Sequence, residues 1–176
     1  AQKTWDGGAG SNNWGDANNW NANTLPVSTD NVVIGNGFTV TLNVNISVAS
    51  LTVGGGSSGS LTIGNGNQDR TLTVTGNVTI NSGATINTTG NGGNTFNIGG
   101  NLSNAGTLTD GGGDVDIVFN GSTQTISGAG LLTGTEGRGA TAGTKTINSA
   151  IIVNGNWTNN GGTVGGTGTV TFGGSG

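Results

Sequence analysis

The stretch TLTVTGNVTINSGATINTTG, residues 71–90, carries the clearest structural pattern of this chain. It contains three short runs in which apolar residues alternate with Thr or Asn, and each run is closed by Gly, Asn or Ser. Alternation with a period of two is typical of β-strands. It assigns to the inner face Leu72, Val74, Val78, Ile80 and Ile86, and to the outer face Thr71, Thr73, Thr75, Thr79 and Thr85.

The same plan recurs along the chain. GNVTINSGATI (76–86), GNLSNAGTL (100–108) and GNWTNNGGTV (155–164) share one pattern, and a second series reads TVTL (39–42), TLTV (71–74), TFNI (95–98), DVDI (114–117), TKTI (144–147) and TVTF (169–172). The members of the second series are on average 26 residues apart. Short strands and Gly-rich corners at such a period predict an all-β fold, a parallel β-helix (β-solenoid) of about six coils. Asn77, Asn101 and Asn156 are expected to stack at one corner.

The composition fits a thin core. Of 176 residues, 39 are Gly, 29 Thr and 26 Asn, while 30 % are apolar and 7 % are charged. With four basic residues and a net charge of −4, the chain lacks the clusters of Lys and Arg that nucleic acids require. No apolar run approaches the ~18 residues of a membrane-spanning helix, so membrane insertion is not expected either.

Residues 1–30 differ from the rest and are predicted to form an N-terminal cap, with residues 31–176 forming the solenoid of a single domain. This segment carries Trp5, Trp14 and Trp20, which would form an apolar lid over the first coil. Solenoid ends need such atypical coils because they expose strand edges and the core. The alternative is that these indole rings lie on the surface and stack on sugars.

The opening pattern W-x-G-G-x-G-x-x-x-W-x-x-x-x-N-W, followed by Pro26 and by DNVVI (30–34), resembles the mature N-terminus of secreted Gram-negative surface proteins of the adhesin-like and autotransporter-like type. The GNLSNAGTL-type coils resemble the stalk repeats of those proteins. This resemblance implies a right-handed parallel β-helix with a structural role outside the cell. It carries over no catalytic residues. A start at Ala1 without Met also suits a secreted protein whose signal peptide has been removed.

The last strand is expected at Thr169, Val170, Thr171 and Phe172, followed only by Gly and Ser, so that either the natural chain continues beyond Gly176 or something else covers the strand edge. A second copy of the protein could cover it, and contacts of this head-to-tail kind produce filaments. The sequence therefore favours a secreted extracellular structural protein, either a self-associating filament subunit or an adhesin stalk. A module that binds surface glycans is an alternative.

Catalytic chemistry is not expected, because the chain has no His and its acidic residues are scattered. The exception is the cluster DGGGDVD, which brings together Asp110, Asp114 and Asp116. These carboxylates could bind calcium, which prefers oxygen ligands, or form a solvated acidic patch. No other cofactor is expected.

Ice binding is the main rival function. Thr-x-Thr pairs at 39–41, 71–73, 144–146 and 169–171 could order water if they formed one flat array. The series is interrupted by TFN (95–97) and DVD (114–116), and a charge within the array should disturb it. Thr is also simply a common residue on the outer face of strands.

Lys145 breaks the apolar pattern, since it occupies an inward position in TKTI. A buried charge is unfavourable unless it is paired. We expect a local irregularity, in which the side chain reaches out at a coil edge, pairs with Glu136, or shifts the register.

Overall fold

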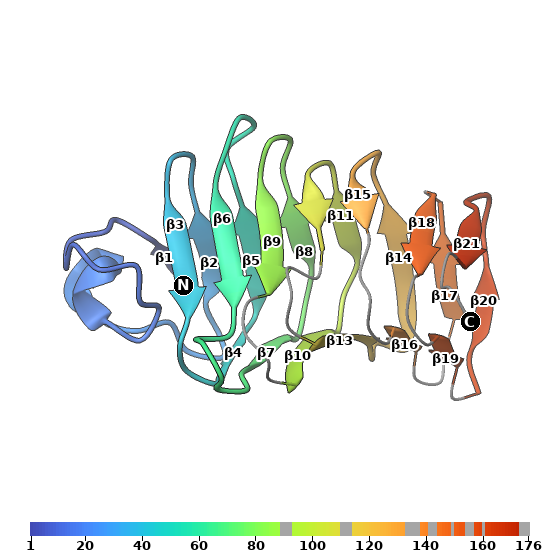
Figure 1. The fold of residues 1–176 in the computed structure, drawn as a ribbon, viewed down its shortest axis with the longest axis horizontal. Coiled ribbons are helices and arrows are strands. Elements are labelled where there is room, and N and C mark those ends of the chain that lie inside the picture. The colour runs from blue at the N-terminus through green and yellow to red at the C-terminus, as the bar shows by residue number, and fades with distance from the viewer. Residues whose placement is uncertain are drawn as a thin grey trace.

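The computed structural model describes residues 1–88, 93–109, 114–132, 138–140, 144–148, 150–153, 157–159 and 161–172. In this part of the chain the structure is all-β, and the helical elements are two short 3-10 turns, η1 (Ala17–Asn19) and η2 (Asn21–Asn23). The predicted fold class is confirmed: parallel strands stack along one axis as a β-solenoid (Figure 1).

Three larger parallel sheets run along the solenoid. The eight-stranded sheet has the order β1 (Gln2–Thr4), β2 (Asn31–Ile34), β5 (Ser50–Val53), β8 (Val78–Ile80), β11 (Leu102–Asn104), β14 (Thr123–Ser127), β17 (Thr144–Ile147) and β20 (Thr163–Gly165). The six-stranded sheet consists of β4 (Ile46–Val48), β7 (Thr71–Val74), β10 (Gly93–Ile98), β13 (Asp114–Phe119), β16 (Arg138–Ala140) and β19 (Trp157–Asn159). The five-stranded sheet consists of β3 (Thr39–Leu42), β6 (Ser60–Ile63), β9 (Thr85–Thr88), β12 (Thr107–Leu108) and β15 (Leu131–Leu132).

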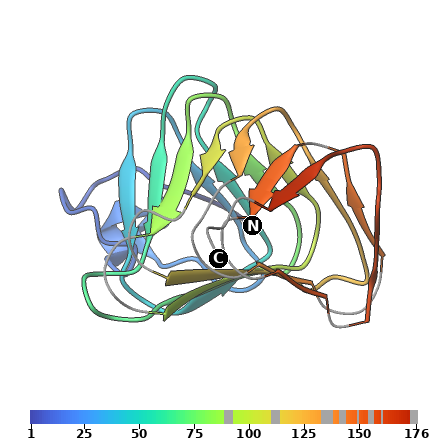
Figure 2. The same cartoon turned by 45° about the vertical axis from the view of Figure 1, so that its right-hand side comes forward.

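From β2 onward, each regular coil contributes one strand to each of these sheets, so sheet neighbours differ by three in strand number; β1, in the cap, pairs with β2. Figure 2 shows the sheets around a common interior, with the six-stranded sheet at the base. Five consecutive coils, which begin at β2, β5, β8, β11 and β14, follow this pattern in all three larger sheets. The strands after them depart from it, because β18 (Ile151–Val153) pairs with β21 (Val170–Phe172) in a separate two-stranded sheet.

The prediction of about six coils therefore differs slightly from the five regular coils observed. The reason is that the TVTL-to-TVTF series, on which the prediction is based, is not uniform. TVTL lies in the five-stranded sheet, TLTV, TFNI and DVDI lie in the six-stranded sheet, and TKTI lies in the eight-stranded sheet. The series thus mixes positions from different sides of the coil. From β2 onward, paired residues in the eight-stranded sheet are 19 to 27 positions apart, as in Asn31↔Ser50 and Leu51↔Val78.

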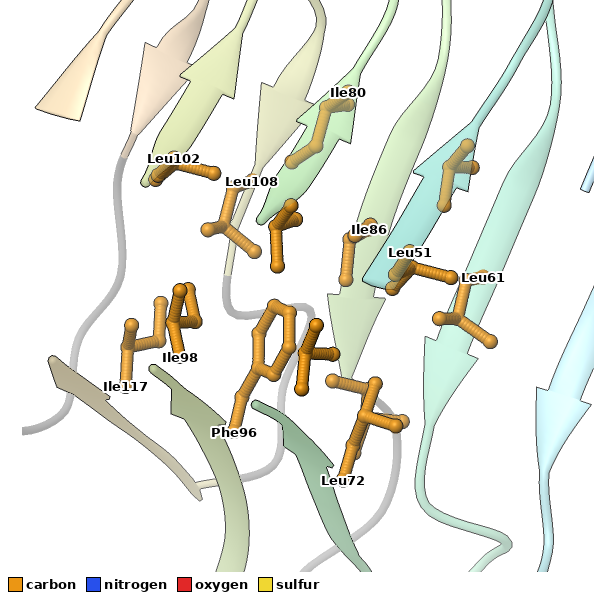
Figure 3. Close-up of a cluster of buried hydrophobic side chains, with 14 of the residues drawn as sticks. Leu51, Leu61, Leu72, Ile80, Ile86, Phe96, Ile98, Leu102, Leu108 and Ile117 are labelled. Carbon is orange, nitrogen blue, oxygen red and sulfur yellow. The ribbon is translucent and has the colours of Figure 1, made fainter. Parts of the chain in front are cut away.

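The core is a stack of apolar side chains that form columns along the inner face of each sheet. In the eight-stranded sheet the column runs through Val32, Leu51, Val78, Leu102, Ile126 and Ile147, all at most 2 % exposed. Figure 3 shows residues from all three sheets converging on this interior, among them Leu102, Leu108 and Phe96. All five predicted inward residues of 71–90 are fully buried.

The corners are closed by asparagine side chains. Asn77 Oδ1 accepts a hydrogen bond from the backbone N–H of Asn101 (2.9 Å), and Asn101 Oδ1 accepts one from the N–H of Thr125 (2.9 Å). Asn77 and Asn101 thus occupy equivalent corner positions in successive coils, but each side chain bonds to the backbone of the next coil and not to the next amide, so the expected ladder of stacked amides does not form between them. Asn156 lies outside the described residues.

Candidate functional site

The three cap tryptophans form one buried aromatic cluster. Trp5 is 2 % exposed, and Trp14 and Trp20 are fully buried. Trp20 lies between the other two, with its ring 5.0 Å from that of Trp5 and 4.7 Å from that of Trp14 in edge-to-face arrangements. The faces of these rings are therefore occupied by protein. They form a lid on the core, and the alternative of a surface platform for sugars at these residues is wrong.

Polar contacts hold this lid in place. Trp20 Nε1 donates a hydrogen bond to the backbone oxygen of Trp14 (2.8 Å), whereas Trp14 Nε1 is buried without a partner. The buried Asn19 side chain donates to the backbone oxygens of Ser11 (2.9 Å) and Asn13 (3.1 Å). One amide thus fixes the loop that carries Trp14, because a buried polar group needs such partners.

The cap also covers strand edges of the first coil. β1 pairs with β2, and Trp14 N donates to the backbone oxygen of Thr41 (2.9 Å) while Thr41 N donates to that of Asn12 (2.7 Å). The edges of β2 and β3 are thereby hydrogen-bonded within the same chain. This arrangement matches the expected role of a terminal coil.

Asp30 joins the cap to the solenoid. Its Oδ2 accepts a hydrogen bond from the backbone N–H of Val27 (3.0 Å), and its Oδ1 lies 3.0 Å from the amino group of Ala1. The Val27 hydrogen bond, helped by the one from the amino group, holds the pKa of the Asp30 carboxyl below its usual value. Asp30 is therefore charged at neutral pH, and its side chain links Ala1 and Val27 while its backbone oxygen accepts a hydrogen bond from Ala49 N (2.8 Å) in the solenoid.

A pocket of about 300 Å³ opens beside the cap, where residues 5–12 pass the turn before β3. It is lined by Trp5, Asp6, Gly7, Gly10, Ser11, Asn12, Gly37, Phe38 and Thr39. Phe38 is partly buried and packs against the core cluster. Sequence reasoning did not find this pocket, because it forms between segments about 30 residues apart and no pattern in either segment indicates it.

The strand predicted at Thr169–Phe172 is present as β21, which begins at Val170. Thr169 precedes it and accepts a hydrogen bond from Ile151 N through its backbone oxygen (2.9 Å). Phe172 is 64 % exposed, and Val164 in β20 is 37 % exposed. The C-terminal strands thus present apolar side chains to solvent.

The eight-stranded sheet contains a buried polar corner. Gln124 pairs in register with Lys145, and both are 1 % exposed. Gln124 donates to the backbone oxygens of Ile98 (2.8 Å) and Gly100 (2.6 Å), and Lys145 Nζ donates to that of Gly121 (2.6 Å). Burial lowers the pKa of Lys145. The lysine therefore does not reach out to solvent, and the register of its strand with β14 is regular; Glu136 lies outside the described residues.

The outer face of the five-stranded sheet carries aligned hydroxyl groups. Register places Thr39, Ser60, Thr85 and Thr107 in one column, and Thr41, Thr62 and Asn87 in a second. The four Thr-x-Thr pairs of the sequence do not form one array, because they lie in four different sheets. For the same reason the acidic strand β13 does not interrupt these columns.

The possible calcium ligands fall largely outside the described structure. Asp110 is not among the described residues, and for Asp114 and Asp116 the structure describes the backbone in β13 but not the side chains. Among the described residues, no group of three or more acidic, His or Cys side chains could hold a metal ion.

Comparison with protein families, with curated proteins and with solved structures finds no match for this chain. Within the described ranges no helix has the length and apolar character needed to cross a bilayer.

Proposed function

We propose that this protein is a secreted structural protein whose solenoids associate head to tail, as filament subunits or as an adhesin stalk. One observation carries the proposal: the large apolar side chains exposed in the described part of the chain gather in its two terminal segments. Leu25 (36 %) and Val27 (55 %) belong to the cap segment, and Val164 (37 %) and Phe172 (64 %) belong to the last two strands. A contact between the two ends would remove all four from water.

The backbone supports the same contact. Parallel strands pair through N–H and C=O groups, and an edge strand is a ready template for another strand. Among the described residues, β20 and β21 each have a partner on one side only. Pairing them with the cap end of a second molecule would extend the stack of coils along its own axis, and a contact that does not close produces a filament.

The buried tryptophans limit how this contact is made. Because Trp5, Trp14 and Trp20 are inside the lid, they stabilise the cap and are not contact residues themselves. The outer side of the cap must meet the next molecule. With 7 % charged residues in the chain, the contact depends mainly on apolar and backbone groups, so association should change little with salt.

Sedimentation velocity and electron microscopy test the proposal. The wild-type protein should form linear assemblies that lengthen with concentration. Phe172→Asp and Val27→Asp should each shift the population toward monomer, because each places a charge in the proposed contact. Ser103→Asp is the matched control, since it adds the same charge on an exposed position of β11, away from both ends. A wild-type protein that stays monomeric at high concentration would contradict the proposal.

Ice binding is a second candidate, favoured by the hydroxyl columns of the five-stranded sheet. Neighbouring strands are ~4.8 Å apart and alternate residues along a strand are ~6.6 Å apart, which gives a regular grid of Thr and Ser with Asn87 at one edge. None of the aligned positions carries a charge. One hydroxyl, that of Thr62, is engaged with Asn87 Oδ1 (2.7 Å).

Thermal hysteresis measurements test this candidate. Thr85→Leu replaces a hydroxyl in the middle of the grid and should abolish hysteresis. Thr52→Leu, the same change on the outer face of β5 in the eight-stranded sheet, should leave it intact. Absence of hysteresis in the wild-type protein would exclude ice binding.

A further inference from the structure

The pocket beside the cap combines one aromatic surface with several free polar groups. Phe38 supplies the aromatic surface, and its ring stands next to Gly7: a methyl group placed on Gly7 would be 3.4 Å from Phe38 Cε1 and 3.7 Å from Trp5 Nε1. Both atoms lie within 4 Å of the same point, so the phenyl ring and the indole N–H stand next to each other on one wall of the pocket. Gly10 and Gly37, at other points of the lining, have open space where a Cβ would stand.

The indole N–H of Trp5 is an unused donor in this wall. Trp5 is 98 % buried, yet its Nε1 has no hydrogen-bond partner among the described residues and, unlike Trp14 Nε1, is not closed off from solvent. A buried Trp N–H usually finds an acceptor. An acceptor group on a bound molecule would supply it.

Two further groups of the lining are free to bind. Asp6 uses Oδ1 to accept from Gly8 N (3.0 Å), which leaves Oδ2 available as an acceptor. The Asn12 side chain makes no hydrogen bond within the described structure, while its backbone oxygen is held by Thr41 N. The side chain is therefore free to offer both a donor and an acceptor without disturbing the cap.

We propose that this pocket binds one ring of a neutral saccharide, with the apolar face of the sugar on Phe38 and its hydroxyl groups on Asp6, Asn12 and Trp5 Nε1. The lining has no Lys or Arg, so a phosphate or an acidic sugar would meet Asp6 without a counter-charge. One carboxylate in the lining is also too few for a calcium site. The volume of about 300 Å³ lies at the small end of known ligand pockets and suits a single ring.

This site differs from the sugar platform that the sequence suggested, because the aromatic contact is Phe38 and the tryptophan contributes its N–H rather than its face. It is also independent of head-to-tail association. The two ideas are tested by different measurements, and one can fail while the other holds.

Titration followed by the ¹H–¹⁵N signals of the assigned tryptophan indoles tests the site. Glucose, galactose, mannose, cellobiose and lactose are added separately to the full chain, up to ~10 mM, ten times a weak Kd of ~1 mM. At least one sugar should shift the Trp5 indole signal in a saturable way. The indole signals of Trp14 and Trp20, which do not line the pocket, should stay in place and serve as an internal control.

Two variants then assign the contact. Phe38→Leu keeps apolar volume but removes the aromatic face, and Asn12→Ala removes the amide; each should weaken sugar binding about tenfold or more. Asn18→Ala, a change at an exposed cap residue outside the pocket, should bind as the wild type does. Unchanged Trp14 and Trp20 signals show that each variant is folded.

Three outcomes would overturn the proposal: no saturable Trp5 shift with any of the five sugars, a shift that both pocket variants retain in full, or a response to calcium chloride or sodium phosphate in place of the sugars.

Discussion

The two terminal regions of the solenoid contain the same kind of strand but differ in how far their strand edges and large side chains are buried. At the cap end, three tryptophans are buried and the edges of β2 and β3 are hydrogen-bonded to the chain's own cap. At the other end, β20 and β21 carry Val164 and Phe172 with much of their surface exposed. Among the described residues both regions share backbone pairing between strands, and what distinguishes the cap region is a set of large buried side chains that the repeat does not supply.

The interior changes along the same axis. The first coils are filled with Leu, Ile and Val, as in the column through Val32 and Leu51. In the later coils Gln124 and Lys145 occupy inward positions of the eight-stranded sheet. A thin core accepts such groups because the backbone oxygens of the corners are close enough to accept their hydrogen bonds.

The largest expected effect separates the two ends directly. Trp20→Ala should destabilise the protein by ~3–5 kcal/mol, since it empties the centre of the aromatic lid. Phe172→Ala should change stability by less than ~0.5 kcal/mol, since that ring is mostly in solvent. Chemical denaturation of dilute, monomeric protein measures both. Similar losses for the two variants would show that Phe172 contributes as much to the free energy of unfolding as the buried Trp20, and would contradict this prediction.

The sequence predicted the strands and their inner faces well, because alternation in a stretch such as 71–90 depends on local geometry. It failed at register: TVTL, TLTV and TKTI look alike but belong to three different sheets. Coils of 19 to 27 residues vary at the corners, and side-chain alternation does not encode corner length. For the same reason the hydroxyl columns and the pocket at Phe38 could not be found from the sequence alone.

Two glycines in tight turns differ in the space around them. Gly83 has a φ of +76°, and a methyl group on it would lie 2.3 Å from the backbone oxygen of Ser57 in the neighbouring coil. Gly161, in the turn before β20, has a φ of +90° but open space around it. Gly161→Ala should therefore lose ~1 kcal/mol from backbone strain alone, and Gly83→Ala at least ~2–3 kcal/mol.

Thermal or urea unfolding of the two glycine variants provides the measurement. Equal losses of unfolding free energy would mean that the neighbouring coil moves away from Gly83 at little cost. The coils around Gly83 would then be packed no more tightly than those around Gly161.

The buried polar corner should appear in the pH dependence of stability. Because burial lowers the pKa of Lys145, the folded protein binds fewer protons than the unfolded chain between that lowered pKa and the usual value of 10.5. Stability should therefore rise with pH through this window and reach its full value above it. Lys145→Met fills similar space without the charge and should remove this rise. At neutral pH the change should stay within ~1–2 kcal/mol, because relief of desolvation opposes the lost bond to Gly121.

Free energies of unfolding, measured between about pH 7 and pH 10.5 for both proteins, give the answer. A rise of equal slope in Lys145→Met would assign the pH dependence to other groups.

The smallest expected effect is at Asp30, the residue that joins the cap to the solenoid, and it concerns stability at acid pH. Its carboxyl has a pKa held below the usual value, chiefly by the hydrogen bond from Val27 N and then by the one from the Ala1 amino group. The stability it contributes is present above the usual aspartate pKa and is lost as pH falls through the lowered folded pKa. Asp30→Asn keeps an oxygen that can accept from Val27 N but has no charge. The variant should be slightly less stable than the wild type near neutral pH, and the difference should shrink as pH falls below the usual aspartate pKa. Urea unfolding across that range tests this, and a gap between the two proteins that stays constant with pH would show that Asp30 acts through its shape and not through its charge.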